Sequence, residues 1–217
     1  MANVLRDILK CNIDADRMLF RQLEDNDKAL KLSIKGLREN MNKFVKKSTA
    51  ANMALLAKCD LAIEQYKDNP KYEKIRTTAE YTKAAAYRNM GDGYRYFTEI
   101  DINNDEVKAN AKKYYDLSLE LAKNFLPKGI NLQFLNTNLN AAVFRFDICQ
   151  ERQEAFDNLL QVFNDAKQIV YPLISEHGKS QGSPGYVTDN FHPMQLLFQV
   201  MDTNLREWSK THGSHSM

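Results

Sequence analysis

The sequence predicts an all-α protein, a single domain of about seven antiparallel helices, and three observations indicate this fold class. Apolar residues recur three and four positions apart over long segments, which is the spacing of one face of an α-helix. Only 5 prolines and 8 glycines occur in 217 residues, so few positions interrupt a helix. No segment shows the alternating pattern of a strand. We expect the helical domain to span residues 1–210 and residues 211–217 to form a flexible tail.

Clusters of helix-breaking residues divide the chain into the seven expected helices. Asparagine and aspartate favour turns, and proline lacks the backbone donor that a helix interior requires. The breaks fall at Asp25-Asn26-Asp27, Asn69-Pro70, Asn103-Asn104-Asp105, Pro127-Lys128-Gly129, Gln150-Glu151 and the stretch from Gly178 to Gly185. The last stretch is rich in glycine and serine and is expected to form a mobile loop, because glycine increases backbone entropy.

The composition excludes several functional classes. Lysine and arginine number 30 against 28 acidic residues, and a net charge of +2 is too small to attract nucleic acid by field strength alone. No apolar run approaches the roughly 18 residues of a membrane span, and the start of the chain lacks a signal-peptide layout. Cys11, Cys59 and Cys149 are far apart, so neither a disulfide framework nor a zinc site is expected. We therefore expect a cytoplasmic protein without cofactor that binds neither nucleic acid nor membranes.

Enzymatic function is not expected. All four histidines fall in predicted loops, at helix starts or in the tail, where none is placed for acid–base catalysis. The segment from Asp101 to Asp105 begins like a calcium-binding loop. It lacks the required glycine, however, and Lys112 stands where a bidentate glutamate is needed. This segment is better interpreted as a helix-capping turn.

The first predicted helix carries a charged stripe. Lys10, Asp14, Arg17 and Arg21 are spaced by four, three and four positions, which places them on one face. Apolar residues occupy most of the remaining circumference. Two interpretations are open: a solvated face with an ion pair between residues four positions apart, or a group of cations inside a concave surface.

Two later helices combine asparagine with apolar neighbours. One face of the fifth predicted helix carries Asn136, Asn140, Val143 and Asp147. A similar stripe in the last predicted helix contains Leu197, Val200, Asn204 and Trp208. A side-chain amide both donates and accepts hydrogen bonds. An asparagine among apolar residues therefore either satisfies a neighbouring backbone group or holds the main chain of a ligand.

The middle of the chain places a cation beside a phenol. Arg95 and Tyr96 are adjacent within the segment from Gly91 to Glu99, and both side chains donate hydrogen bonds. A phosphoserine at neutral pH carries nearly two negative charges and three acceptor oxygens, which guanidinium and phenol donors match. This pair therefore suits a single phosphate group.

Three segments together resemble the 14-3-3 family of phosphopeptide-binding proteins. Gly91-Asp92-Gly93-Tyr94-Arg95-Tyr96 is similar to the family's Gly-Asp-Tyr-Tyr-Arg-Tyr, and the segment from Leu139 to Ile148 is similar to its Leu-Asn-Phe-Ser-Val-Phe-Tyr-Tyr-Glu-Ile. Asn204-Leu205-Arg206-Glu207-Trp208 matches its closing Asn-Leu-x-x-Trp. The resemblance extends from about Asn3 to Trp208. Because Asn3 matches the start of the family's third helix, we expect the family's two amino-terminal helices to be missing.

The resemblance implies a concave groove that holds phosphopeptides in an extended conformation. Arg95 and Tyr96 would bind the phosphate together with Arg17 and Lys10. Asn140 and Asn204 would hold the ligand backbone. The groove wall and the bracing of its cations would be formed by Leu139, Val143, Asp147, Leu197, Val200 and Trp208. Asp147 stands where the family has a glutamate, so its carboxylate reaches less far by one methylene group.

The implied partners are phosphorylated proteins, for which this protein would act as a signalling adaptor. Because the helices of the usual family dimer are expected to be missing, a monomer, a homodimer of non-standard kind and a truncated form are all open. The family recognises phosphoserine close to a free carboxylate, and Ser216 precedes the final Met217. A tail phosphorylated at Ser216 is therefore a candidate ligand of the protein's own groove.

Two alternatives to phosphate recognition are open. One is a helical scaffold of the tetratricopeptide kind, which binds peptides without requiring phosphate, although no clear 34-residue repeat is present. The other is a family member that has lost ligand binding. Asp14 lies beside the cations of the first helix, and Met90 stands where the family has a basic residue, and these two positions keep this second alternative open.

Overall fold

The computed structural model describes residues 28–124, 132–177 and 188–213, and the side chains of 33–123, 132–168 and 193–210. These residues form six α-helices and no strand. The helices are α2 (Lys28–Tyr66), α3 (Glu73–Ile100), α4 (Asp105–Asn124), α5 (Leu132–Val143), α6 (Arg152–His177) and α7 (Thr188–Gly213). A 3-10 helix, η1 (Pro70–Tyr72), precedes α3, and a π-helical turn, η2 (Phe144–Ile148), follows α5. The predicted all-α fold class is confirmed.

The helix ends that the structure describes agree with the predicted breaks. Asn69 caps η1, because its side chain accepts a hydrogen bond of 3.1 Å from the backbone nitrogen of Lys71. The break between α3 and α4 contains Asn104, whose side chain accepts from the backbone nitrogen of Val107 at 3.2 Å. At the break after η2, Gln150 has a positive φ of 60°. Each break therefore has a local physical cause.

Several predicted features lie outside the described residues. These are the first predicted helix with the break at residues 25–27, the break at 127–129, and the glycine-rich stretch at 178–185. The expectation that two amino-terminal helices are missing also stays a prediction. At the other end, α7 continues to Gly213, so this helix reaches into the segment expected to be a flexible tail.

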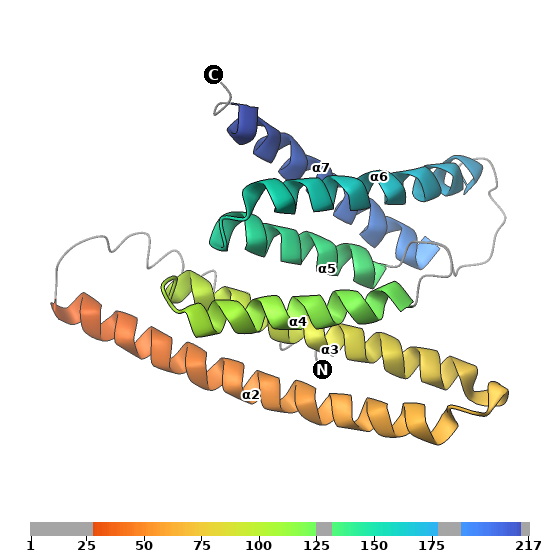
Figure 1. Cartoon of the computed structure of the whole chain (residues 1–217), viewed down its shortest axis with the longest axis horizontal. Coiled ribbons are helices and arrows are strands. Elements are labelled where there is room, and N and C mark those ends of the chain that lie inside the picture. Colours follow the sequence, from red (N-terminus) through yellow and green to blue (C-terminus); the bar gives the residue numbers. More distant parts are fainter. Residues whose placement is uncertain (1–27, 125–131, 178–187, 214–217) are drawn as a thin grey trace.

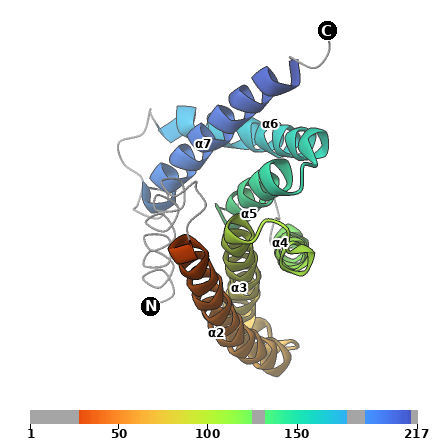
Figure 2. The same ribbon diagram turned by 90° about the vertical axis from the view of Figure 1, so that its left-hand side faces the viewer.

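Consecutive helices run antiparallel and stack from α2 at one end of the molecule to α7 at the other (Figure 1). Figure 2 shows α3, α5 and α7 following one another along one side, with α4 and α6 along the other side. Helix α5 is central, because it contacts α3, α4, α6 and α7. Among the described helices, none has the length and apolarity that crossing a lipid bilayer would require.

The largest cluster of buried apolar side chains joins α5, η2, α6 and α7. Its most buried members include Leu159 and Met201, with exposed fractions of 1% and 0%. Within this cluster the rings of Phe146 and Trp208 are stacked, with centroids 4.1 Å apart and an interplanar angle of 6°. The contact fixes η2 against α7.

Candidate functional site

Arg95 lies in the middle of a polar face of α3. Its Nε donates a hydrogen bond of 3.1 Å to the hydroxyl oxygen of Tyr115 on α4, and its Nη1 lies 3.3 Å from Oε1 of Glu99. The guanidinium carbon is also 4.2 Å from the ring centroid of Tyr96. Arg95 and Tyr96 therefore lie in contact, and their expected joint binding of a phosphate stays a prediction.

The surroundings of Arg95 keep it charged. Burial opposes the positive charge, but Tyr115, Asp92, Tyr96 and Glu99 together outweigh this effect and raise the pKa of Arg95. Only 12% of the side chain is exposed. Among the residues that the structure describes, none accepts a hydrogen bond from the remaining terminal nitrogen, Nη2. Within the described part of the chain, Arg95 is therefore a fixed cation whose Nη2 donors have no acceptor.

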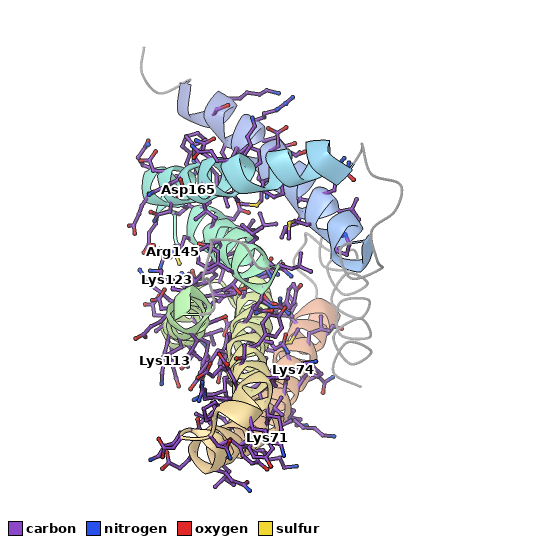
Figure 3. The ribbon with its side chains drawn as sticks, turned by 90° about the vertical axis from the view of Figure 1, so that its right-hand side faces the viewer. Lys71, Lys74, Lys113, Lys123, Arg145 and Asp165 are labelled. Atoms are coloured by element: carbon purple, nitrogen blue, oxygen red, sulfur yellow. The ribbon has the colours of Figure 1, made fainter. Side chains whose placement is uncertain are left out.

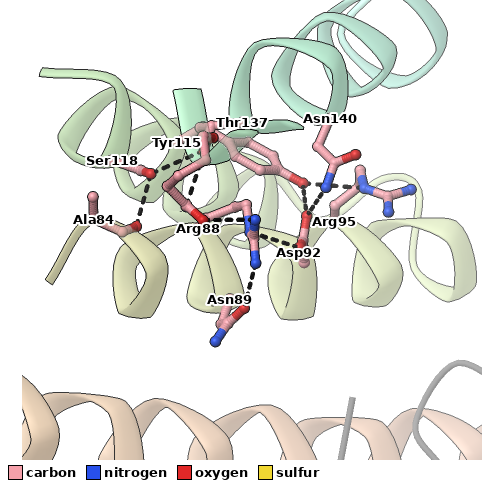
Figure 4. Close-up of polar contacts among 10 residues, drawn as sticks. Ala84, Arg88, Asn89, Asp92, Arg95, Tyr115, Ser118, Thr137 and Asn140 are labelled. Atoms are coloured by element: carbon pink, nitrogen blue, oxygen red, sulfur yellow. Dashed lines mark hydrogen bonds and ion pairs between the residues drawn. The ribbon is translucent and has the colours of Figure 1, made fainter. Parts of the chain in front are cut away.

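Asp92 connects Arg95 to the polar face of α5. Its Oδ1 accepts a hydrogen bond of 2.7 Å from the hydroxyl of Tyr115 and a second of 2.9 Å from Nδ2 of Asn140 (Figure 4). Its other oxygen, Oδ2, lies 3.9 Å from Nε of Arg88. A chain of contacts therefore links Arg95, Tyr115, Asp92 and Asn140 across three helices.

Gly91 gives Tyr115 the space that this arrangement needs. A Cβ atom at Gly91 would lie 2.9 Å from Cδ1 of the Tyr115 ring, closer than real side chains approach. Tyr115 itself is 1% exposed. The Gly91-Asp92 pair thus has two physical roles, because Gly91 leaves room for the Tyr115 ring and Asp92 accepts a hydrogen bond from the Tyr115 hydroxyl.

The polar chain continues from Asp92 away from Arg95. Nη1 of Arg88 donates to Oε1 of Gln133 at 2.8 Å. Beyond it, Ser118 donates to the backbone oxygen of Ala84 at 2.8 Å, and its hydroxyl lies 3.3 Å from that of Thr137 (Figure 4). These contacts provide partners for polar side chains buried between α3, α4 and α5, whereas Nε of Arg88 has no hydrogen-bond partner among the described residues.

The two faces of α5 have different surroundings. One face of α5 carries Phe134 and Asn138, which line a cavity of about 530 Å³ between α4, α5 and α6 together with Arg145 of η2. Figure 3 views this side of the molecule and labels Arg145 together with Lys123 and Asp165 from the cavity rim. Helical geometry therefore places the stripe of Asn136, Asn140, Val143 and Asp147 on the opposite face.

Asp147 lies in η2, near Arg95 but not bound to it. Burial raises the pKa of the Asp147 carboxyl group, whereas the positive charges of Arg152 and Arg95 lower it and Glu99 raises it further. Within the described part of the chain, no ion pair joins Asp147 to Arg95. Asp147 and Arg95 therefore influence each other electrostatically without direct contact, and the expected bracing of the cations by Asp147 stays a prediction.

The apolar residues expected in the groove wall fall into two groups. Leu139 and Trp208 lie in the core, with exposed fractions of 6% and 7%. Val143 and Leu197 are half-buried at the edge of the same cluster, and Val200 is 48% exposed. Val143, Leu197 and Val200 therefore present more surface to a ligand than Leu139 and Trp208. The Trp208 ring is covered because it stacks on Phe146.

Some predicted site residues are not brought together by the described structure. Lys10, Arg17 and Ser216 lie outside the described residues, so their roles stay predictions. Asn204 is half-buried on α7, one helical turn before Trp208. The sequence analysis did not identify Tyr115. The Gly91-Asp92 pair was the one indirect sign of it, because a helical glycine leaves room for a side chain of another helix and a buried aspartate needs a hydrogen-bond donor.

Comparisons with known proteins bear on the family and the fold. A family model described as 14-3-3 protein matches residues 1–209 of this chain. The crystal structure of a 14-3-3 protein from Cryptosporidium parvum matches it with a TM-score of 0.54 at 17% sequence identity. This match covers 96% of the present chain and 84% of the other. The search of curated proteins found no match.

Proposed function

Because this chain belongs to the 14-3-3 family, a family of non-enzymatic adaptors, we propose that it binds proteins phosphorylated on serine or threonine. The phosphopeptide would lie extended in a groove on the side of the molecule where α3, α5 and α7 follow one another. We also propose that the protein works in the cytoplasm.

The state of Arg95 is the observation that carries this proposal. Its charge is supported by four neighbouring groups, and two of its three nitrogens are already engaged. A phosphate oxygen is a strong acceptor for the donors of Nη2. Each charge-assisted hydrogen bond contributes about 1.5–3 kcal/mol, so removing the phosphate should weaken binding by about tenfold or more per bond lost.

The other proposed roles follow the arrangement around Arg95. Tyr96 would complete the phosphate site together with Arg17 and Lys10. Nδ2 of Asn140 donates to Asp92, which leaves the amide oxygen of Asn140 to accept from the backbone N–H of the ligand. Asn204 would hold the ligand backbone from α7. The wall beside them would be formed by Val143, Leu197 and Val200, with Leu139 and Trp208 supporting it from the core.

Two further features belong to the same proposal. Members of this family typically form dimers. For this chain a homodimer of non-standard kind and a monomer are the proposed states, and light scattering separates them by mass. Phosphorylated Ser216 would compete with partner peptides for the groove, so deleting residues 211–217 from phosphorylated protein should strengthen peptide binding.

Fluorescence anisotropy with two labelled peptides tests the proposed function. The peptides share one sequence and differ only in phosphorylation of a central serine. We expect the protein to bind the phosphorylated peptide at least about tenfold more tightly, and Arg95→Gln to remove most of this preference. Arg206→Gln is the matched control, because Arg206 is 75% exposed on α7 and pairs with Asp202.

The alternatives predict other results. A scaffold of the tetratricopeptide kind would bind both peptides alike, and a family member without ligand binding would bind neither. Treating a cell lysate with phosphatase before a pull-down gives the same distinction with natural partners. Retention of the same partners after phosphatase treatment would contradict phosphate dependence.

A further inference from the structure

We infer that Tyr115, which lies on α4, is a positioning residue for Arg95 and couples it through Asp92 to Asn140. This inference rests on the proposed function, because Arg95 and Asn140 are the proposed contacts for the phosphate and for the ligand backbone. Tyr115 would touch no ligand itself. Its hydroxyl would fix the direction in which the phosphate-binding group points.

The hydrogen bonds of Tyr115 have one possible direction. A phenol has a single hydroxyl hydrogen, which Tyr115 donates in a hydrogen bond of 2.7 Å to the carboxylate of Asp92. The hydroxyl oxygen is then left to accept from Nε of Arg95 at 3.1 Å. A carboxylate on one side and a guanidinium on the other therefore polarise the hydroxyl in the same sense.

The ring of Tyr115 is held so firmly that its hydroxyl has little freedom. On one side it packs against the backbone of Gly91. It also contacts Phe144, with ring centroids 5.9 Å apart. Since Tyr115 is 1% exposed, water has no access to replace its hydroxyl in the chain of hydrogen bonds.

Two fixed points determine the plane of the Arg95 guanidinium. Tyr115 holds Nε and Glu99 holds Nη1, and the planar group then has no remaining freedom to rotate. Nη2, which has no acceptor among the described residues, is therefore presented in one direction before a ligand arrives. Such preorganisation reduces the entropy that binding would otherwise lose.

The same carboxylate oxygen sets the orientation of Asn140. Oδ1 of Asp92 accepts from both Tyr115 and Asn140, so the Asn140 amide turns its nitrogen inward. The contact proposed for phosphate on α3 and the contact proposed for the ligand backbone on α5 thus share one anchor. A shift of Tyr115 would disturb both contacts at once, and this coupling separates a positioning role from general packing.

Tyr115→Phe tests the inference, and Tyr114→Phe is the matched control. Both changes remove one phenolic oxygen from adjacent positions of α4. Tyr114 packs against the rings of Tyr87 and Tyr94, and its hydroxyl has no hydrogen bond to any other described residue. We expect Tyr115→Phe to weaken binding of the phosphoserine peptide by about tenfold and to leave the unphosphorylated peptide unaffected. Tyr114→Phe should change neither.

An NMR signature of Arg95 provides a readout that does not depend on ligand. In the wild-type protein, the Nε proton of Arg95 should exchange slowly with solvent, because it is buried in a hydrogen bond to Tyr115. In Tyr115→Phe it should exchange much faster, and in Tyr114→Phe it should stay slow. Should the wild-type Arg95 proton exchange as fast as that of exposed Arg206, the inference is overturned even if Tyr115→Phe does not fold.

A double-mutant cycle tests the coupling to Asn140. Asn140→Ala should weaken phosphopeptide binding in the wild-type background and have a smaller effect in Tyr115→Phe, because without the Tyr115 hydroxyl Asp92 no longer links Asn140 to Arg95. Equal effects in both backgrounds would overturn the coupling. Wild-type protein that binds both peptides alike would instead refute the proposed function. A wild-type preference for the phosphopeptide that Tyr115→Phe keeps in full refutes the positioning role alone.

Discussion

The ring of Tyr115 packs directly on the backbone of Gly91, so that a Cβ atom at Gly91 would lie 2.9 Å from Cδ1 of the ring. Gly93, two residues further along α3, has open space at the same position. Both glycines lie inside the helix, where alanine is favoured over glycine by about 1 kcal/mol. An alanine at Gly93 therefore changes helix propensity alone, whereas an alanine at Gly91 also collides with the Tyr115 ring.

Gly93→Ala should raise the free energy of unfolding by about 0.5–1 kcal/mol, because it adds helix propensity without a collision. Gly91→Ala should lower it by about 1–3 kcal/mol, since the new methyl group displaces a fully buried ring. Urea denaturation of the three proteins measures both differences. An equal increase for both variants would show that Tyr115 does not lie against Gly91.

Alkaline pH should destabilise the protein through Tyr115. Burial raises the pKa of its hydroxyl well above the ordinary value, Asp92 adds to this effect, and Arg95 opposes it. As the pH rises above about 10, tyrosine in the unfolded chain loses its proton while Tyr115 in the folded protein keeps it. The stability that depends on this difference is therefore present below about pH 10 and is lost as the pH rises through the folded pKa.

Urea midpoints measured between pH 8 and about 11 check this expectation. The wild-type midpoint should fall more steeply with pH than that of Tyr115→Phe. Lys112 is present in both proteins, and its pKa, raised by a hydrogen bond from its side chain to Glu151, contributes in the same direction to each. The difference between the two slopes therefore isolates Tyr115, and identical slopes would contradict a buried hydroxyl.

Trp208 should contribute strongly to stability. Its ring is stacked on Phe146 and is 7% exposed, so Trp208→Ala should lower the free energy of unfolding by about 3–5 kcal/mol. Val200 belongs to the same predicted stripe but is 48% exposed, and Val200→Ala should change stability by less than about 0.5 kcal/mol. Chemical denaturation distinguishes the two variants. A similar small cost for both would place Trp208 outside the core.

The sequence predicted the fold class and most of the described helix ends, because these depend on local spacing and on turn residues such as Asn69-Pro70. It also placed Arg95 beside Tyr96 and grouped Asn140 with Asp147 on one face of the fifth predicted helix, which corresponds to α5 and η2. Contacts within one helix follow from the periodicity of that helix. They require no knowledge of how the helices pack.

The depth of each side chain did not follow from the same reasoning. The predicted stripe on α7 included Val200 and Trp208, whereas the buried residues are Met201, Leu205 and Trp208. Periodicity identifies a face only to within about one residue, or 100°, and neighbouring helices decide which part of the face is covered. Val200 is exposed because the neighbouring helices cover the adjacent position, Met201, instead.

Tyr115 could not be found from the sequence because its partners are distant in the chain. Its hydroxyl bonds to residues 20 and 23 positions away, on a different helix. No periodic pattern encodes such a contact. The π-helical turn η2 is similar, since its hydrogen bond from the backbone nitrogen of Cys149 to the oxygen of Phe144 adds one residue to the turn without any marker in the sequence.

A crystal structure of the protein with a bound phosphoserine peptide is the most direct test of phosphate recognition by Arg95. We expect a phosphate oxygen about 2.7–2.9 Å from Nη2 of Arg95, with the hydrogen bond from Nε to Tyr115 retained. A phosphate bound elsewhere, for example in the cavity beside Arg145 between α4 and α6, with Nη2 of Arg95 making no contact to the ligand, would contradict it.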